Sequence, residues 1–303
     1  MWFKNLQLYR FTSEFQYTSE ELAEKLIPGE FQPCGKRDLS QYGWVAPMGP
    51  GFAELIHAAN GFTMICARKE EKVMPSAVIK ELVDDKAAII EAQEDRKLYR
   101  KERETLKEEI IFDALPHAFT RSSRTFAYID PRNGWLVVDA ASPKKAEELT
   151  SYLRETLGSL PVVPPQVVAS PSVVMTQWLR EENVPEDLLI LNEAELRESA
   201  EDGSIIRCKN QDLSAEEVTA HLDAGKQAYK LAVEWDENFS AILNDDLTLK
   251  RLKFDESLIS EADDAGTEDA AAKFDADFAI MTLTLGRFLP RLLEYFEGEK
   301  TPV

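Results

Sequence analysis

The sequence contains little of what enzymes and secreted proteins commonly use. Only three cysteines occur in 303 residues, far apart and without a CxxC spacing, so neither a disulfide framework nor a zinc site is indicated. The histidines, His57, His117 and His221, form no HExxH or HxH pattern, and no GxxxxGKS/T or GxGxxG loop is present. We therefore expect a protein that is not an enzyme and that needs no cofactor or metal.

Long hydrophobic runs are also missing. No window approaches the roughly 20 consecutive apolar residues of a membrane-spanning helix, and the N-terminal MWFKNLQLYRF lacks the apolar core and cleavage site of a signal peptide. We expect a soluble, cytoplasmic protein with no membrane partner. Apolar residues make up 44% of the chain, which is enough for a substantial core.

Positive charge is scarce as well. The chain has 35 lysines and arginines against 55 aspartates and glutamates, a formal net charge of −20. Non-specific DNA binding depends on neutralising phosphates, so this balance counts against a nucleic-acid partner. Exposed charges are nevertheless screened beyond a Debye length of about 8 Å at physiological salt. A local basic surface could therefore bind DNA while the rest of the molecule stays acidic.

Residues 96–132 reverse the overall balance. They hold nine basic and six acidic residues, or +3, which leaves −23 for the remainder. If they begin as a helix, Arg96, Arg100, Arg103 and Lys107 are spaced by four, three and four residues, and their cations would lie on one face beside Lys97. The alternative is a solvated helix whose lysines and glutamates pair with one another at i,i+4.

Two further clusters could contact phosphate oxygens. The polar run 118–124 places Arg121 and Arg124 among hydroxyl side chains. The second cluster lies at the end of a predicted strand and after the following helix, and could equally be ordinary surface: it comprises Arg207, Lys209, Asn210, Gln211, Lys226 and Lys230.

Periodicity and turn signals predict the elements in outline. Thr18 and Glu21 form a capping-box pattern, Ser214 and Glu217 form another, and Asn133-Gly134 is a hairpin signal. The segment 75–110 reads as a long helix with Val78, Leu82 and Ile89 on its apolar face; it exceeds the usual length, so we expect it to be bent, broken or projecting. The predicted helices are 18–27, 75–110, 144–158, 172–181, 214 onwards and 274–296. The predicted strands are 3–11, 61–72, 124–130, 135–141, 204–209, 228–235, 238–243 and 247–254, and 255–277 reads as an exposed acidic loop.

This order of elements predicts an α+β fold in which helices cover antiparallel sheets. Three prolines in 160–166 disfavour regular structure. We therefore predict an N-terminal region 1–160, a proline-rich linker 161–170 and a C-terminal region 171–303.

Several strings, taken together and in order, resemble the recombination-associated RdgC family from Met1 to about Leu285. They are MWFKNLQLYRF, GWVAPMG, MPSAVIKELV, LPHAF, SPKKAEELTSYLRETLGSLPV, MTQWL, CKNQDL and DLTLKRLKF. The resemblance implies horseshoe-shaped subunits that close into a ring-shaped homodimer. Such a ring binds duplex DNA, and also single strands, with little sequence preference. It further implies nucleoid association and restraint of RecA-mediated strand exchange in recombination and replication-fork repair.

The resemblance also implies site residues. Phe119 in LPHAF matches an aromatic at a ring-closing dimer interface, and Lys209, Gln211 and Lys226 fall where the family contacts DNA. His117 and Asn238 stand where basic residues are expected, which predicts weaker binding or a lower salt dependence. The full set of predicted DNA-binding residues is Arg96, Lys97, Arg100, Arg121, Arg124, Arg207, Lys209, Gln211 and Lys226.

Two alternatives remain open at this point. The chain could be an acidic protein-interaction factor that regulates recombination proteins without binding DNA. The weaker alternative is a metal-dependent nuclease, with magnesium held by the acidic segment that contains Asp263, Asp264, Glu268 and Asp269.

Overall fold

The computed structural model describes residues 1–181, 183–200, 202–265 and 269–300. Its strands are β1 Leu6–Phe11, β2 Ser40–Trp44, β3 Ile56–Ala59, β4 Phe62–Lys72, β5 Thr120–Asp130, β6 Trp135–Asp139, β7 Val162–Val163, β8 Leu188–Arg197, β9 Ile205–Lys209, β10 Gln227–Trp235, β11 Phe239–Asn244 and β12 Leu249–Phe254. Its helices are α1 Ser19–Leu26, α2 Ser76–Glu94, α3 Arg100–Ala114, α4 Pro143–Leu157, α5 Pro171–Glu181, α6 Glu216–Asp223, α7 Glu256–Ala265 and α8 Ala270–Glu294, with short 3-10 turns η1 Ile27–Gly29 and η2 Leu115–His117. The predicted α+β class is confirmed.

The strands form one antiparallel sheet in the order β2-β4-β5-β6-β1-β12-β11-β10-β8-β9, with β3 beside β4 and β7 beside β1. The two halves of this sheet meet where β1 pairs with β12 at a single register position, Leu6 opposite Leu249. The proline-containing segment supplies β7, which pairs with β1 at Arg10 and Phe11. The boundary at 161–170 stays a prediction.

The N-terminal half follows its local signals closely. Thr18 and Glu21 form the predicted capping box of α1, and the β5–β6 hairpin turns where Asp130 accepts hydrogen bonds from the amides of Arg132 and Asn133. Helices α1 and α4 bury their apolar sides against one face of the sheet because both are strongly amphipathic. Their shared core includes Leu22, Leu26, Leu149, Leu153, Ile65, Ala127, Leu136 and Val138.

In the C-terminal half, the long helix α8 packs across the sheet. The strands predicted at 228–235, 238–243 and 247–254 form β10, β11 and β12, and β8 adds a strand that the sequence interpretation missed. Phe278, Met281, Leu285 and Phe288 of α8 lie in the largest core. That core also takes in Phe62 and Tyr128 of the N-terminal strands, so α8 ties the two halves together.

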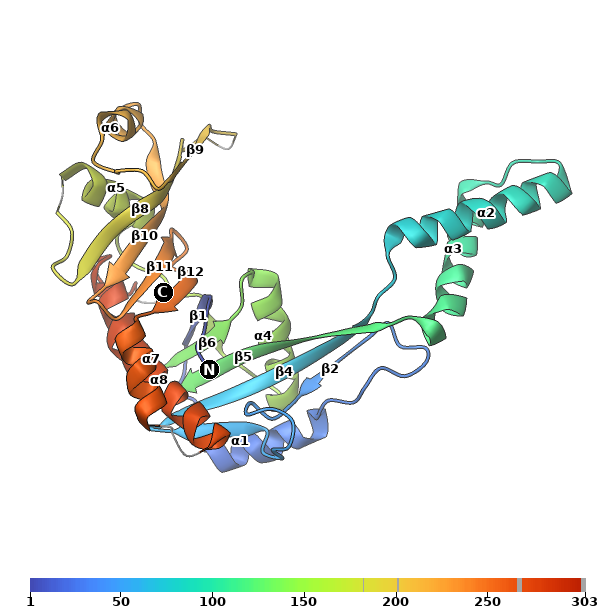
Figure 1. The fold of residues 1–303 in the computed structure, drawn as a ribbon, viewed down its shortest axis with the longest axis horizontal. Coiled ribbons are helices and arrows are strands. Elements are labelled where there is room, and N and C mark those ends of the chain that lie inside the picture. The colour runs from blue at the N-terminus through green and yellow to red at the C-terminus, as the bar shows by residue number, and fades with distance from the viewer. Residues whose placement is uncertain (182, 201, 266–268, 301–303) are drawn as a thin grey trace.

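Figure 1 shows an arm extending from the body, on the side away from the C-terminal half. We define the arm as α2, α3, η2 and the ends of β4 and β5 that carry them. The β4–β5 ladder runs unbroken from Thr63 opposite Ile129 to Lys72 opposite Thr120. The helices have a small core of their own, made of Ile79, Val83, Ala87, Leu106 and Ile110.

Four local predictions are wrong. The 75–110 segment is broken, as the prediction allowed, by left-handed Asp95 (φ 51°), so Arg96 lies off the helix and the four-cation stripe does not form. Val78, Leu82 and Ile89 are exposed, because α2 turns Ile79, Val83 and Ala87 towards α3 instead.

The other two concern the C-terminal half. Ser214 does not cap α6: the cap position is Ala215, and Ser214 donates to Asp212 instead. The segment 255–277 is largely helical, forming α7 and the beginning of α8, because Asp255 accepts from the Ser257 amide and Asp269 caps the N-terminus of α8. Glu268 lies outside the described residues.

Candidate nucleic-acid interface

The C-terminal sheet has one covered face and one open face. Leu231 and Val233 of β10 point into the core with α8, and Ala194 and Leu196 of β8 do the same. Because side chains alternate along a strand, Lys230 and Glu195 lie on the other side. The open face is therefore formed by the polar residues of each strand.

The strand register brings cations from three strands together on that open face. Arg207 of β9 lies opposite Glu195, and Glu195 lies opposite Lys230 of β10. Lys209 lies opposite Glu193, and Lys250 of β12 lies opposite Ile242. These side chains line a hollow of about 320 Å³. We call its five cations the basic face: Arg207, Lys209, Lys230, Lys250 and Arg251.

Glu195 is the centre of this arrangement. Its side chain is only 6% exposed, and it accepts from Arg207 Nε at 2.8 Å, Lys230 Nζ at 3.0 Å and Arg197 Nε at 2.8 Å. Burial alone raises the pKa of Glu195, but the hydrogen bonds from Arg207, Lys230 and Arg197 outweigh it and hold the pKa at about 2. The carboxylate is thus charged at neutral pH and fixes three cations in place.

The other members of the basic face are less constrained. Arg251 pairs with Glu193 at 2.6 Å. Across the residues that the structure describes, Lys209 and Lys250 make no salt bridge. Counting Glu193 and Glu195, the hollow carries five positive and two negative charges. Its excess cations can contact phosphate oxygens on a strand of nucleic acid.

The structure brings together only part of the predicted C-terminal cluster. Arg207 and Lys209 belong to the basic face, whereas Gln211 donates to Glu217 beyond the end of β9. Lys226 bonds the hydroxyl of Ser204 at the opposite end of that strand. Lys250 and Arg251 were missed: strict alternation in LKRLKF would place these neighbours on opposite sides of β12, whereas both line the hollow and Arg251 has a left-handed conformation (φ 53°).

The predicted basic residues of the arm are largely paired with acids. Arg96 makes a two-pronged contact with Glu102 at 2.8 and 2.9 Å, which raises the pKa of the guanidinium and lowers that of Glu102 to about 2. Lys97 pairs with Glu91 at 2.6 Å and Arg100 with Glu104 at 3.2 Å. This pairing resembles the solvated helix that we considered as the alternative.

Arg121 and Arg124 lie on β5, opposite Glu71 and Arg68 of β4. Arg121 is exposed and Arg124 is half-buried. Phe119 precedes them and is 87% exposed, the largest exposed fraction among the large apolar residues that the structure describes. Its carbonyl accepts from the Val73 amide at 2.7 Å, so the ring is presented from a fixed backbone at the base of the arm helices.

The acids considered for magnesium have local partners. Asp263 pairs with Lys273, and Asp269 accepts from the amides of Ala271 and Ala272 at the start of α8. Within the described ranges, no group of three or more His, Cys, Asp or Glu residues is placed to hold a metal ion. In the same ranges, no helix has the length and apolar character needed to cross a membrane.

A family model described as "Putative exonuclease, RdgC" matches residues 1–299 of the chain. The chain belongs to the RdgC family. The relative from Aeromonas hydrophila is 48% identical over the full length of both chains, and the relative from Tolumonas auensis is 48% identical over 99% of both. A relative from Pseudomonas fluorescens is 45% identical over the whole of this chain and 99% of its own. Each is named "Recombination-associated protein RdgC", so the predicted family is confirmed.

Proposed function

We propose that this chain is a non-enzymatic protein that binds DNA, mainly duplex and also single-stranded, without sequence preference. The observation that carries the proposal is the basic face, where five cations line one hollow in a chain of net charge −20 and two of them, Arg207 and Lys230, pair with the buried carboxylate of Glu195. The basic face is carried by strands of an open sheet. Its lysines and arginines suit contacts to the phosphate backbone, which carry no sequence information.

The proposed assembly is a ring-shaped homodimer that encloses the DNA. In Figure 1 the C-terminal half and the arm lie at opposite ends of the molecule, leaving two ends by which horseshoe-shaped subunits would join. The exposed ring of Phe119 at the arm supports an interface there. By occupying DNA in the cytoplasmic nucleoid, such a ring would limit RecA-mediated strand exchange in recombination and replication-fork repair.

DNA contact is tested with a Lys209→Ala/Lys250→Ala variant. It removes the two lysines of the basic face that make no salt bridge within the described residues. Its affinity for two unrelated duplexes is measured by fluorescence anisotropy across a salt series. We expect equal weakening on both sequences and a salt slope reduced by about 2, because each phosphate contact contributes about 0.9. The control, Lys97→Ala/Arg100→Ala, removes the same charge from the arm and should change affinity little. An unchanged affinity in the first variant would refute the proposal.

Enclosure is tested separately, on a covalently closed circle and a linear duplex of one sequence. An enclosing dimer should stay on the circle after a high-salt challenge and slide off once the circle is cut. Equal loss of protein from the circle and from the linear duplex would contradict the enclosing ring, but not DNA binding itself.

A second candidate function is favoured by the paired cations of the arm, which leave the chain's surface mainly acidic. As an acidic protein-interaction factor, it would regulate recombination proteins directly. The Lys209→Ala/Lys250→Ala variant discriminates between the two, since restraint of strand exchange should fall with DNA binding. Restraint that persists in this variant would favour the protein partner.

The family description also names an exonuclease. The direct check is incubation of end-labelled DNA with the protein and Mg²⁺, where we expect no shortening. Shortening that disappears in an Asp263→Asn/Asp264→Asn variant would make the acidic segment a nuclease site.

A further inference from the structure

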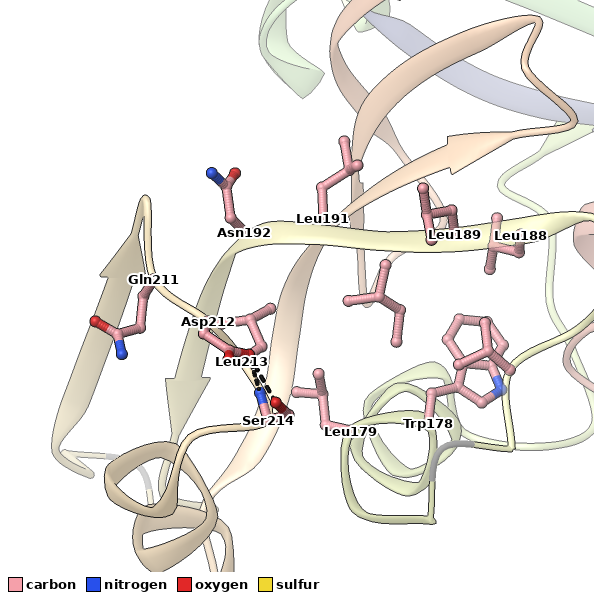
Figure 2. Close-up of a pocket in the computed structure, with 12 residues that line it drawn as sticks. Trp178, Leu179, Leu188, Leu189, Leu191, Asn192, Gln211, Asp212, Leu213 and Ser214 are labelled. Carbon is pink, nitrogen blue, oxygen red and sulfur yellow. Dashed lines mark hydrogen bonds between the residues drawn. The ribbon is translucent and has the colours of Figure 1, made fainter.

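A second concave surface lies beside the first half of β8, away from the basic face. It has a volume of about 650 Å³, within the range of binding sites in general. Trp178 and Leu179 of α5 face the strand, and Leu213 approaches from the loop before α6 (Figure 2). Leu189 is 57% exposed at its edge. We call this surface the β8 groove.

The groove exists because β9 covers only part of β8. The ladder between β8 and β9 begins where Lys209 lies opposite Glu193. From there it continues only towards Arg197, the C-terminal end of β8. Asn210 adopts a left-handed conformation (φ 51°), and the Gln211 amide donates a last hydrogen bond to the Asn192 carbonyl at 3.1 Å before the chain leaves the strand. In the ranges that the structure describes, no strand pairs with Leu188–Asn192 on this side. The groove therefore occupies the place that a longer β9 would fill.

The backbone at this edge can accept another strand. The carbonyl of Asp187 accepts from the Asp236 amide at 2.9 Å, and Leu189 lies opposite Glu234 two positions later. Because backbone groups alternate in direction along a strand, Ile190 turns its N–H and C=O towards the open edge. Exposed strand edges of this kind are templates for pairing with an extended segment.

The loops around the groove favour one charge in the partner. Residues 181–187 and 210–217 flank the lining residues Val184 and Leu213, and contain no lysine or arginine. Asp187 is neutralised by Arg291 at 2.9 Å, but the other acids have no such arginine partner within the described chain. The described acids of these two segments, which include the end of α5 and the start of α6, are Glu181, Glu186, Asp187, Asp212, Glu216 and Glu217.

We propose that the β8 groove binds an extended segment of a partner protein, which adds a strand to the edge of β8. The segment would pair with Ile190, place apolar side chains against Trp178, Leu179 and Leu213, and carry basic residues on its flanks. This site is separate from the basic face, and it does not depend on the proposed DNA binding.

The probe is a fluorescein-labelled ten-residue peptide of alternating valine and threonine with two arginines at each end. We expect it to bind the full chain and to slow hydrogen exchange at the amide of Ile190. Two further peptides carry N-methyl groups on the amides of one edge or of the other, so that each has one edge unable to donate hydrogen bonds. Their affinities should differ, because only one edge of the peptide faces β8. A form with glutamates in place of the arginines should bind more weakly.

Leu189→Asp should reduce peptide affinity by about tenfold or more, since it removes an apolar contact and adds a charge of the same sign as the loops. Leu283→Asp makes the same change at an exposed leucine of α8 (50% exposed) and should have no effect. DNA binding should be unchanged in both.

Three results would overturn the proposal. One is no protection of Ile190 at millimolar peptide, and another is equal binding of both N-methylated forms. The third is loss of the dimer in Leu189→Asp alone, because the groove would then be covered by a second copy of this chain.

Discussion

At the scale of single residues, Glu195 determines how the basic face is presented. Lysines and arginines on an open sheet would otherwise sample many rotamers, and ordering each on DNA would cost conformational entropy. The buried carboxylate holds Arg207, Lys230 and Arg197 before any ligand arrives. It also offsets part of their mutual repulsion, so five cations can share a small area.

We expect Glu195→Gln to destabilise the fold by about 2 kcal/mol at pH 7, because it removes charge-assisted hydrogen bonds from a buried group. The pKa is depressed from 4.5 to about 2, so this stability is present above pH 4.5 and is lost as the pH falls towards 2. Urea unfolding at several pH values measures the difference between variant and parent.

That difference should shrink between pH 4.5 and 2. The control, Glu193→Gln, affects a more exposed carboxylate that has one partner, Arg251, and should cost less than about 1 kcal/mol. A Glu195→Gln variant as stable as the parent at pH 7 would show that the three cations do not depend on the carboxylate.

The exposed ring of Phe119 gives a specific prediction for the dimer. If its ring is buried between subunits, Phe119→Ala should weaken the dimer by about 2 kcal/mol, or roughly 30-fold in dissociation constant. Unfolding of the monomer should barely change, because the ring is 87% exposed within the subunit. Sedimentation at several concentrations measures the dimer, with Ile27→Ala (60% exposed, on the body) as the control. A dimer equally strong in both variants would remove Phe119 from the interface.

At the scale of elements, the arm joins a stiff ladder to a helical pair. The β4–β5 register continues for ten residue pairs without a bulge, and α2 and α3 pack on each other through a separate core. Their connection is ordered by charge. Arg96 binds Glu102, and Glu102 in turn accepts from the Tyr99 amide at 2.8 Å at the start of α3. Arg96 therefore stabilises the connection between α2 and α3.

Arg96→Ala should loosen this turn without loss of the overall fold. We expect faster hydrogen exchange at the first-turn amides of α3, because Glu102 loses the partner that positions it. Arg100→Ala is the matched control, since Arg100 makes a single exposed i,i+4 pair with Glu104. The idea fails if exchange is equal in the two variants, or if Arg96→Ala reduces DNA affinity as strongly as loss of Lys209 does.

At the scale of the whole molecule, the arm and the C-terminal half have separate tasks in the proposed function. The basic face lies on the C-terminal sheet, whereas Phe119 lies at the base of the arm helices, between η2 and β5. Figure 1 shows the C-terminal half and the arm on opposite sides of the body. DNA contact and ring closure should therefore be separable, because no side chain is shared between them.

Replacing residues 73–119 with Asn-Gly should separate the two tasks. Lys72 and Thr120 are the last pair of the ladder, so a two-residue hairpin turn can join them. We expect the variant to fold, to lose the dimer and retention on closed circles, and to bind short linear duplex at low salt within a few-fold of the parent monomer. Mass in solution and anisotropy check these points, and a dimer that survives would place the main interface elsewhere.

The sequence by itself determined the features set by near neighbours. The α1 capping box, the Asn133-Gly134 hairpin and the strands β10, β11 and β12 depend on patterns within a few residues, so the sequence predicted them correctly. The break in 75–110 was anticipated from length alone. The family was identified from collinear strings that span nearly the whole chain.

Only the tertiary structure decided which residues meet. Lys209 and Lys250 are 41 positions apart in the sequence, and they share one face because four strand registers align. The pairing of Arg96 with Glu102, the exposure of Val78 and the open edge at Ile190 likewise depend on where helices and strands stop and what packs beside them. Periodicity reports one element at a time, whereas the charge of a surface depends on the register between elements, because each one-residue shift moves a side chain to the opposite face.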